Sequence, residues 1–135
     1  MSAPGGPLIA RILVVEDSSA MRAFVRAALE EAGVVREVIE AASGFEALRI
    51  LPREQVDLAI VDINMPDVNG LELIRFMRKS ESHKDTPLIV ISSEASERDR
   101  ERGLTLGANA YLAKPFTAEA LVALVRELAG EGEGA

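Results

Sequence analysis

Polar residues with complementary chemistry stand at the ends of four short apolar runs. In chain order they are Glu16 and Asp17, Asp62, Ser92 and Ser93, and Lys114. Clustered carboxylates bind a hard cation such as Mg²⁺, with Mn²⁺ as an alternative ion. Hydroxyls donate hydrogen bonds to phosphate oxygens, a lysine ammonium attracts them, and an aspartate carboxylate can act as a nucleophile. This set of residue types predicts a phosphoryl site beside a magnesium site.

Each of these positions is weak evidence when taken alone. An aspartate after an apolar run is usually a turn or helix-capping residue, and Glu16 with Asp17 could be a solvated pair before a helix. A carboxylate at the end of a buried strand is nevertheless costly to desolvate unless something pairs with it. The prediction therefore depends on whether the chain brings all of these residues to one place.

The pattern of apolar residues predicts five strand–helix units in series. The expected strands are residues 9–15, 35–41, 58–61, 88–91 and 110–113, and the expected helices are 18–32, 43–51, 71–79, 96–107 and 117–128. Such alternation predicts a parallel sheet with helices on both faces. In a parallel sheet the carboxyl ends of the strands lie along one edge, where ligands of open α/β folds bind. The polar residues above should converge at that edge.

Composition narrows the functional classes. The chain has 135 residues with 22 acidic and 15 basic side chains, a formal net charge of −7, which argues against nucleic acid or a membrane as the main partner. With no cysteine, disulfides, thiolate zinc sites and cysteine nucleophiles are excluded. No apolar run is long enough for a membrane span. We expect a cytoplasmic monomer with a flexible lead at 1–8, one domain at 9–129 and a flexible tail at 130–135.

Four segments carry a resemblance to a known family: ILVVEDS, IVDINMPDVNGLEL, PLIVISSEA and GANAYLAKPF. Together they resemble the receiver domains of two-component response regulators, especially stand-alone CheY-like ones, from about residue 11 to residue 128. The resemblance implies a flavodoxin-like (CheY-like) (βα)5 doubly wound sheet with strand order 2-1-3-4-5. CheY is itself a familiar example of that order, so the order comes from the likeness and not from the apolar pattern.

The resemblance also implies the roles of the site residues. Asp62 matches the phosphoacceptor, and Glu16, Asp17 and the backbone carbonyl of Asn64 match the protein ligands of Mg²⁺. Lys114 matches the phosphate-binding lysine. In the family the phosphoryl group comes from a histidine kinase and is later removed by water, so such a chain catalyses only its own phosphorylation and dephosphorylation and is not otherwise an enzyme.

Further positions match the switching machinery of the family. Ser92 matches the hydroxyl residue that moves toward the phosphoryl group, and Tyr111 matches an aromatic residue whose ring reorients with it. The peptide bond before Pro115 is expected to be cis. The output partner is expected to bind the face made by the fourth helix, fifth strand and fifth helix. A role in chemotaxis is suggested by the CheY-like character alone.

A few positions depart from the usual pattern. Ser93 stands where a small Ala or Gly is frequent, and Asn64 and Glu94 flank the path of attacking water and should tune dephosphorylation. The fourth helix is densely charged over 97–102, which is most simply a solvated face, and Gly103 within it costs about 1 kcal/mol relative to alanine. A helix of marginal stability that responds to the switch is the sharper interpretation of this segment.

Several alternatives remain open. The chain could be a relay intermediate that passes phosphate to a histidine phosphotransfer protein. A phosphatase of the haloacid dehalogenase type would need a second Asp at the position of Asn64. A flavin or dinucleotide binder would need a glycine-rich phosphate loop, which this sequence does not contain. An interaction module that is not phosphorylated would have no use for the polar residues at the strand ends. His83 is expected to be solvated in a polar loop, and Asp67 and Asn69 to be turn and cap residues.

Overall fold

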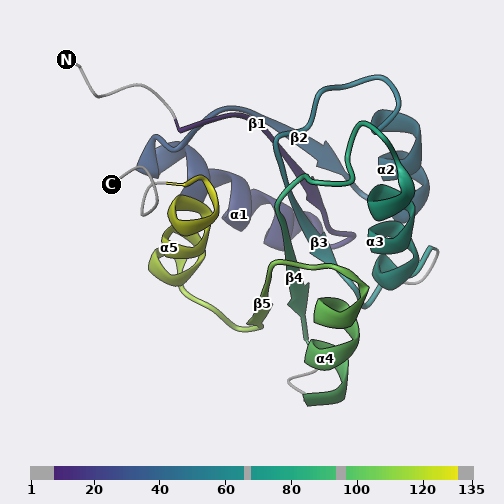
Figure 1. The fold of residues 1–135 in the computed structure, drawn as a ribbon. Helices are drawn as coiled ribbons and strands as arrows, with labels where there is room; N and C mark the ends of the chain where they lie inside the picture. Colours follow the sequence, from purple (N-terminus) through teal and green to yellow (C-terminus); the bar gives the residue numbers. More distant parts are fainter. Residues whose placement is uncertain (1–7, 66–67, 94–96, 131–135) are drawn as a thin grey trace.

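Five parallel strands form one sheet in the order β2-β1-β3-β4-β5 in a computed structural model that describes residues 8–65, 68–93 and 97–130 (Figure 1). The elements are β1 Ile9–Val15, α1 Ser19–Ala32, β2 Val35–Ala41, α2 Gly44–Ile50, β3 Leu58–Asp62, α3 Gly70–Lys79, β4 Leu88–Ser92, α4 Glu97–Leu106, β5 Ala110–Ala113 and α5 Ala118–Leu128. The expected order 2-1-3-4-5 is confirmed. Strands β3 and β4 each run one residue further than expected, so their last residues are Asp62 and Ser92.

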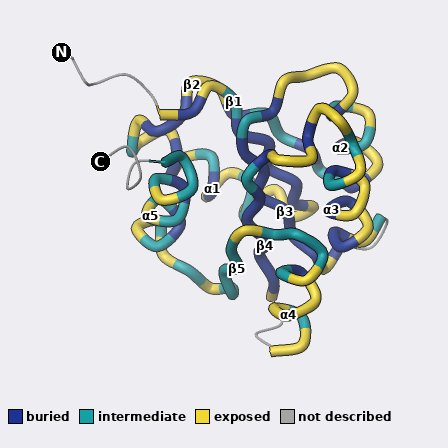
Figure 2. The backbone as a smooth tube through the Cα atoms, viewed as in Figure 1, coloured by how far each residue is buried: buried dark blue, intermediate teal, exposed yellow. Residues whose placement is uncertain are grey.

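Helices cover both faces of the sheet, as Figures 1 and 2 show. Side chains alternate between two cores along each central strand. In β3, Leu58 and Ile60 pack on the side of α1 and α5, and Ala59 and Val61 pack on the side of α2 and α3. Because both faces are covered, such strands are apolar along their whole length. This explains why runs rather than alternating patterns mark the strands in the sequence.

Short polar side chains fix where the helices begin. Ser18, Ser43 and Thr117 each accept a hydrogen bond from the backbone N–H three residues further on, at 3.0–3.1 Å. These contacts satisfy donors that have no partner inside the helix. Asn69 caps α3 by accepting the backbone N–H of Leu71, two residues further on, at 2.7 Å. Gly33 ends α1 with a φ of 68° that favours glycine. The expected helix boundaries are therefore set by local chemistry.

The prediction that His83 is solvated is wrong. Its side chain is 2% exposed, and its Nε2 lies 2.8 Å from the carbonyl oxygen of Leu51 at the end of α2. A carbonyl only accepts, so Nε2 carries the proton and donates it. The carbonyls of the last helical turn have no partner inside the helix, and His83 satisfies one of them. This contact ties the loop after α3 to the end of α2.

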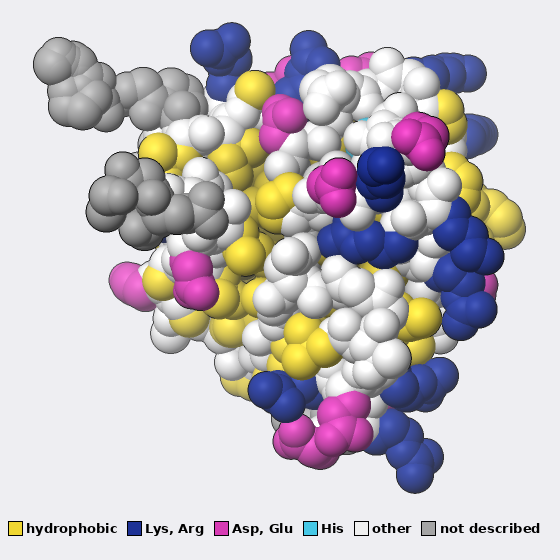
Figure 3. All heavy atoms as spheres, viewed as in Figure 1, with side chains coloured by type: hydrophobic (Ala, Val, Ile, Leu, Met, Phe, Trp, Pro, Cys, Tyr) yellow, Lys and Arg dark blue, Asp and Glu magenta, His cyan; other side chains and the backbone are white. Residues whose placement is uncertain are grey.

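Helix α4 presents a charged surface, as expected. Gly103 is the one buried residue of this helix, and Figure 3 shows acidic and basic side chains side by side at its end of the molecule. The solvated face predicted for 97–102 is confirmed. None of the described helices is long and apolar enough to cross a bilayer. Residues 1–7 and 131–135, which make up most of the predicted lead and tail, lie outside the described residues.

Candidate functional site

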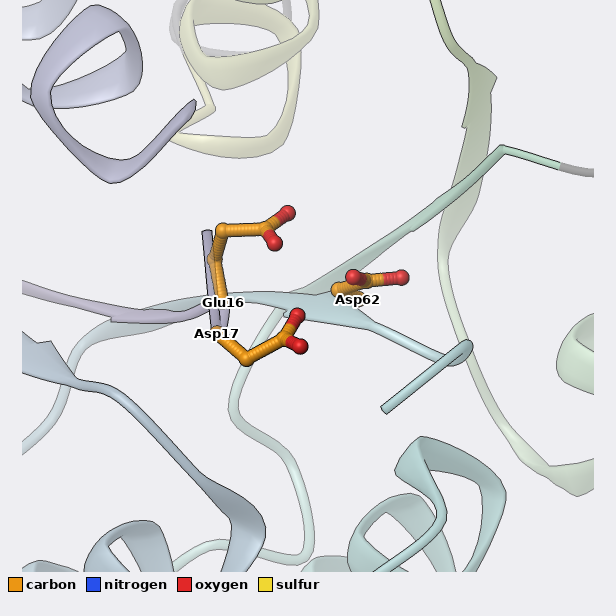
Figure 4. A group of neighbouring side chains, drawn as sticks. All are labelled: Glu16, Asp17 and Asp62. Atoms are coloured by element: carbon orange, nitrogen blue, oxygen red, sulfur yellow. The ribbon is translucent and has the colours of Figure 1, made fainter. Parts of the chain in front are cut away.

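Three carboxylates meet at the carboxyl edge of the sheet. Glu16 and Asp17 follow β1 and Asp62 ends the neighbouring strand β3, and one oxygen from each lies within 4.8 Å of the others. Figure 4 shows the three side chains turned toward a common space. Glu16 is 1% and Asp62 is 2% exposed, whereas Asp17 faces solvent. The parallel pairing of β1 with β3 produces this convergence from residues 45 positions apart.

Lys114 supplies the opposite charge from the end of β5. Its Nζ lies 2.8 Å from Oε1 of Glu16 and 3.4 Å from Oδ2 of Asp62. Burial raises the pKa of Glu16, although hydrogen bonds from Lys114 and the Ser18 amide act against this. Burial lowers the pKa of Lys114, but its hydrogen bond to Glu16 and the nearby carboxylate charges outweigh it, so the pKa lies above its ordinary value. The ammonium therefore stays charged at neutral pH.

Glu16 is held in place by contacts that the sequence pattern does not predict. Its Oε2 accepts the backbone N–H of Ser18 at 2.9 Å, and its carbonyl oxygen accepts Nη1 of Arg22 at 2.8 Å. Arg22 in turn donates from Nε to Glu40 on β2 at 3.0 Å. Arg22 thus ties the turn after β1 to the neighbouring strand. No motif identifies Arg22 beforehand, because an arginine beside an apolar helix face usually lies in solvent.

Asn64 connects the ends of β3 and β4. Its backbone N–H donates to Oδ1 of Asp62 at 2.9 Å, and its side-chain Oδ1 accepts the hydroxyl of Ser92 at 2.8 Å and the N–H of Ser93 at 3.1 Å. The hydroxyl of Ser93 lies 3.4 Å from the same oxygen. The sequence points to Asn64 through its backbone carbonyl and through the water path. Its side-chain contact with Ser92 is a finding of the structure.

The remaining predicted residues fall into two groups. Tyr111 is half-buried on β5, paired in register with Val90 two residues before Ser92, and the bond between Lys114 and Pro115 is cis, as the resemblance implied. Glu94 and Asp67 lie outside the described residues. The structure places Glu16, Asp17, Asp62, Asn64, Ser92, Ser93 and Lys114 at one edge. Their roles in catalysis and switching stay predictions.

The donor set fits a hard divalent cation. Three carboxylates with oxygens within 4.8 Å of one another concentrate negative charge that a single ammonium does not balance. Oxygen-only ligands with few carboxylates suit Mg²⁺, which retains several waters. Among the described residues this is the one group of three acidic or histidine side chains close enough to share an ion. Glu16, Asp17 and Asp62 would hold it.

Comparison with known proteins agrees with this geometry. The family model described as response regulator receiver domain matches residues 12–126. The chain belongs to the response regulator receiver domain family. It is 37% identical over 125 residues to a chemotaxis protein CheY homolog of Campylobacter jejuni, covering 92% of this chain and 95% of that protein. The likeness to a stand-alone receiver domain thus extends over almost the whole of both chains.

Solved receiver structures have the same fold. The chemotaxis response regulator CheY4 of Vibrio cholerae matches with a TM-score of 0.81 and 34% identity, over 88% of this chain and 98% of that one. The receiver domain of a Pseudomonas aeruginosa sensor histidine kinase matches with a TM-score of 0.81 and 32% identity, over 90% and 98% of the two chains. That structure has a magnesium ion coordinated in its active-site cleft.

Proposed function

We propose that this receiver domain accepts a phosphoryl group on Asp62 from a phosphohistidine of a sensor kinase, in a reaction that requires Mg²⁺. The observation that carries the proposal is the placement of Asp62, a buried carboxylate beside Glu16 and Asp17 with the Lys114 ammonium 3.4 Å from its Oδ2. A carboxylate in a satisfied cap has no need of two acidic neighbours and a cation. This arrangement suits an attacking nucleophile.

The transfer balances as a simple displacement. An oxygen of the Asp62 carboxylate attacks phosphorus, the P–O bond forms, the P–N bond to the donor imidazole breaks, and the imidazole nitrogen keeps the electron pair. Lys114 lies where its ammonium can attract a phosphoryl oxygen, and Ser92 can donate to another. Bound Mg²⁺ would offset the charge that the carboxylates and phosphoryl oxygens share. Mn²⁺ has the same oxygen preference and should substitute.

Phosphorylation then biases a two-state element. The added charge at Asp62 should draw Ser92 and Lys114 toward the phosphoryl group. Tyr111 lies on β5, whose register pairs it with the strand that carries Ser92, so displacement of β4 can reach its ring. We expect the response to appear on the surface of α4, β5 and α5, where α4 offers the charged side chains in Figure 3.

The signal would leave by reversible binding of an output protein to that surface. The near-complete overlap with a chemotaxis CheY homolog supports a terminal regulator. We propose that it acts as a cytoplasmic monomer. Likeness to the receiver domain of a sensor histidine kinase supports a second candidate, a relay intermediate. Incubating the phosphorylated chain with a histidine phosphotransfer domain separates the two, because only a relay receiver passes the phosphoryl group on.

Acetyl phosphate with Mg²⁺ tests the phosphoacceptor directly. Wild-type protein should shift on a phosphate-affinity gel, Asp62→Asn should not, and EDTA should abolish the shift. Asp57→Asn is the matched control, because Asp57 immediately precedes β3 at the opposite end of the same strand and accepts the backbone N–H of Arg11. A shift that survives Asp62→Asn, or one that is lost in Asp57→Asn alone, contradicts the assignment.

A further inference from the structure

The side chain of Asn64 is oriented by its contacts. The backbone N–H of Ser93 can only donate, and it points at Oδ1 of Asn64 from 3.1 Å, so the amide oxygen rather than the amide nitrogen faces β4. The hydroxyl of Ser92 donates to the same oxygen at 2.8 Å. Ser92 is fully buried, whereas Asn64 and Ser93 are exposed. An accessible side chain thus holds a buried hydroxyl.

The same residue also touches the proposed phosphoacceptor. The backbone N–H of Asn64 donates to Oδ1 of Asp62 at 2.9 Å. Asn64 therefore forms a hydrogen bond through its backbone with Asp62, the residue that is modified, and another through its side chain with Ser92, the residue that must respond. A displacement of the Asp62 carboxylate would be transmitted to the Ser92 contact through a single residue.

We propose that Asn64 is a positioning residue that holds Ser92 in the arrangement of the unphosphorylated protein. A serine hydroxyl has one proton and cannot donate it fully to two acceptors. Ser92 must therefore release Oδ1 of Asn64 before it can donate to a phosphoryl oxygen on Asp62. This inference rests on the proposed function, and it adds a contact that opposes the switch.

The energetic consequence follows from the two-state description. A hydrogen bond present only in the unphosphorylated arrangement lowers the free energy of that state and raises its population. Phosphorylation must then supply more free energy to shift the protein into the other state. The bond is partly exposed, so its net contribution lies at the low end of the range for neutral hydrogen bonds. Removing it should tighten binding of a phosphoryl mimic by about two- to fivefold.

The contact from the Ser93 amide that orients the Asn64 side chain can be tested in unphosphorylated protein. Asn64→Leu keeps the shape of the side chain and every backbone atom but removes the acceptor, and Asn64→Asp keeps an acceptor oxygen. Hydrogen exchange of the Ser93 amide, followed by NMR, should be accelerated in Asn64→Leu and restored toward wild type in Asn64→Asp. Unchanged exchange in Asn64→Leu overturns the inference, because the Ser93 amide would then not hold Oδ1 of Asn64 toward Ser92 in solution.

The opposition to switching is measured with beryllofluoride at saturating Mg²⁺. The chain has one tyrosine and no tryptophan, so Tyr111 fluorescence is a single-site readout, with ¹⁹F NMR as an independent measure. Asn64→Leu should bind beryllofluoride about two- to fivefold more tightly than wild type. In a Ser92→Ala background the same substitution should change the affinity by less than about 1.5-fold, since the hydrogen bond from Ser92 to Asn64 is already gone.

The outcomes separate this inference from the proposed function. If wild type binds no beryllofluoride and is not phosphorylated, the proposed function fails and the inference fails with it. If wild type binds but Asn64→Leu binds equally or more weakly, the proposed function stands and the inference is overturned. If Asn64→Leu tightens binding equally in the Ser92→Ala background, Asn64 acts by another route and the inference is also overturned.

Discussion

Replacing Lys114 by methionine should destabilise the protein strongly, and divalent cations should reverse much of the loss. Among the described residues, Lys114 is the one cationic side chain that forms an ion pair with Glu16 or Asp62. Both carboxylates are almost completely buried. Methionine keeps most of the apolar stem and removes the charge, so the variant leaves buried negative charge without its partner.

The magnitude follows from burial. Removing one partner of a buried ion pair costs about 3–5 kcal/mol. The side chain of Lys114 is 17% exposed, which places the expected loss near the low end, at about 3 kcal/mol. For a domain of this size about 1 kcal/mol corresponds to roughly 3–5 °C in Tm. We expect Lys114→Met to melt roughly 9–15 °C below wild type in EDTA.

Thermal unfolding followed by circular dichroism measures this loss. A ligand that binds only the folded state stabilises it by mass action. Added Mg²⁺ should raise the Tm of Lys114→Met more than that of wild type, because in the variant the cation replaces the missing ammonium beside the buried carboxylates. Lys84→Met is the matched control, since Lys84 pairs with Glu81 at 3.6 Å on the surface, and it should change the Tm little. If the two variants melt together, Lys114 does not compensate the buried carboxylates.

The pH dependence of this difference has a definite sign. Burial holds the pKa of Glu16 above its ordinary value in the folded protein, and loss of Lys114 should raise it further. A carboxyl with a raised folded-state pKa favours folding at low pH and loses that contribution as the pH rises through the folded pKa. The deficit of Lys114→Met should therefore shrink as the pH falls from 7 toward 5.

Three further substitutions probe the frame around the site. Gly103→Ala should stabilise α4 by about 0.5–1 kcal/mol in urea denaturation, because the new methyl group would lie 3.4 Å from Val90 without a clash; a net loss would contradict this. Gly70→Ala should lower the free energy of unfolding by at least about 1–3 kcal/mol and slow phosphorylation, because the new Cβ would come within 2.6 Å of the backbone at the end of β3. A Tm equal to that of wild type would show that α3 does not pack this closely against β3. The hydrogen bond from Arg22 is the main cause that lowers the pKa of Glu40 in the folded protein, so Glu40→Gln should reduce the free energy of unfolding by about 1 kcal/mol at pH 7. The difference from wild type should fade as the pH drops through the folded-state pKa of Glu40, which lies below the ordinary 4.5. A difference that is independent of pH would exclude the ion pair as its cause.

Sequence reasoning recovers the parts of this fold that local chemistry determines. Apolar runs mark the strands because both faces of the sheet are covered, and Ser18, Ser43 and Thr117 mark helix starts because helices leave backbone donors unpaired. Parallel pairing then brings strand ends to one edge. The placement of Asp62, Glu16 and Asp17 on that edge follows from those rules, whereas the adjacency of β1 and β3 belongs to the strand order, which the family resemblance supplied.

Contacts between distant segments are what the sequence does not reveal. His83 lies in a run of polar residues, and its burial depends on the carbonyl of Leu51, 32 positions earlier. Arg22 is an ordinary helix arginine until its contacts with Glu16 and Glu40 are seen. The bond from Ser92 to Asn64 likewise requires the relative position of two strand ends to within an ångström or so. Residue type and spacing do not encode that precision.

The most direct test of the account locates the phosphoryl group. The chain is phosphorylated with acetyl phosphate and Mg²⁺, reduced with borohydride, which converts an aspartyl phosphate to homoserine, and digested for mass spectrometry. We predict homoserine at position 62, Mg²⁺-dependent and absent from Asp62→Asn. Reduction at another aspartate, or the absence of homoserine from a chain that is demonstrably phosphorylated, would contradict the central claim.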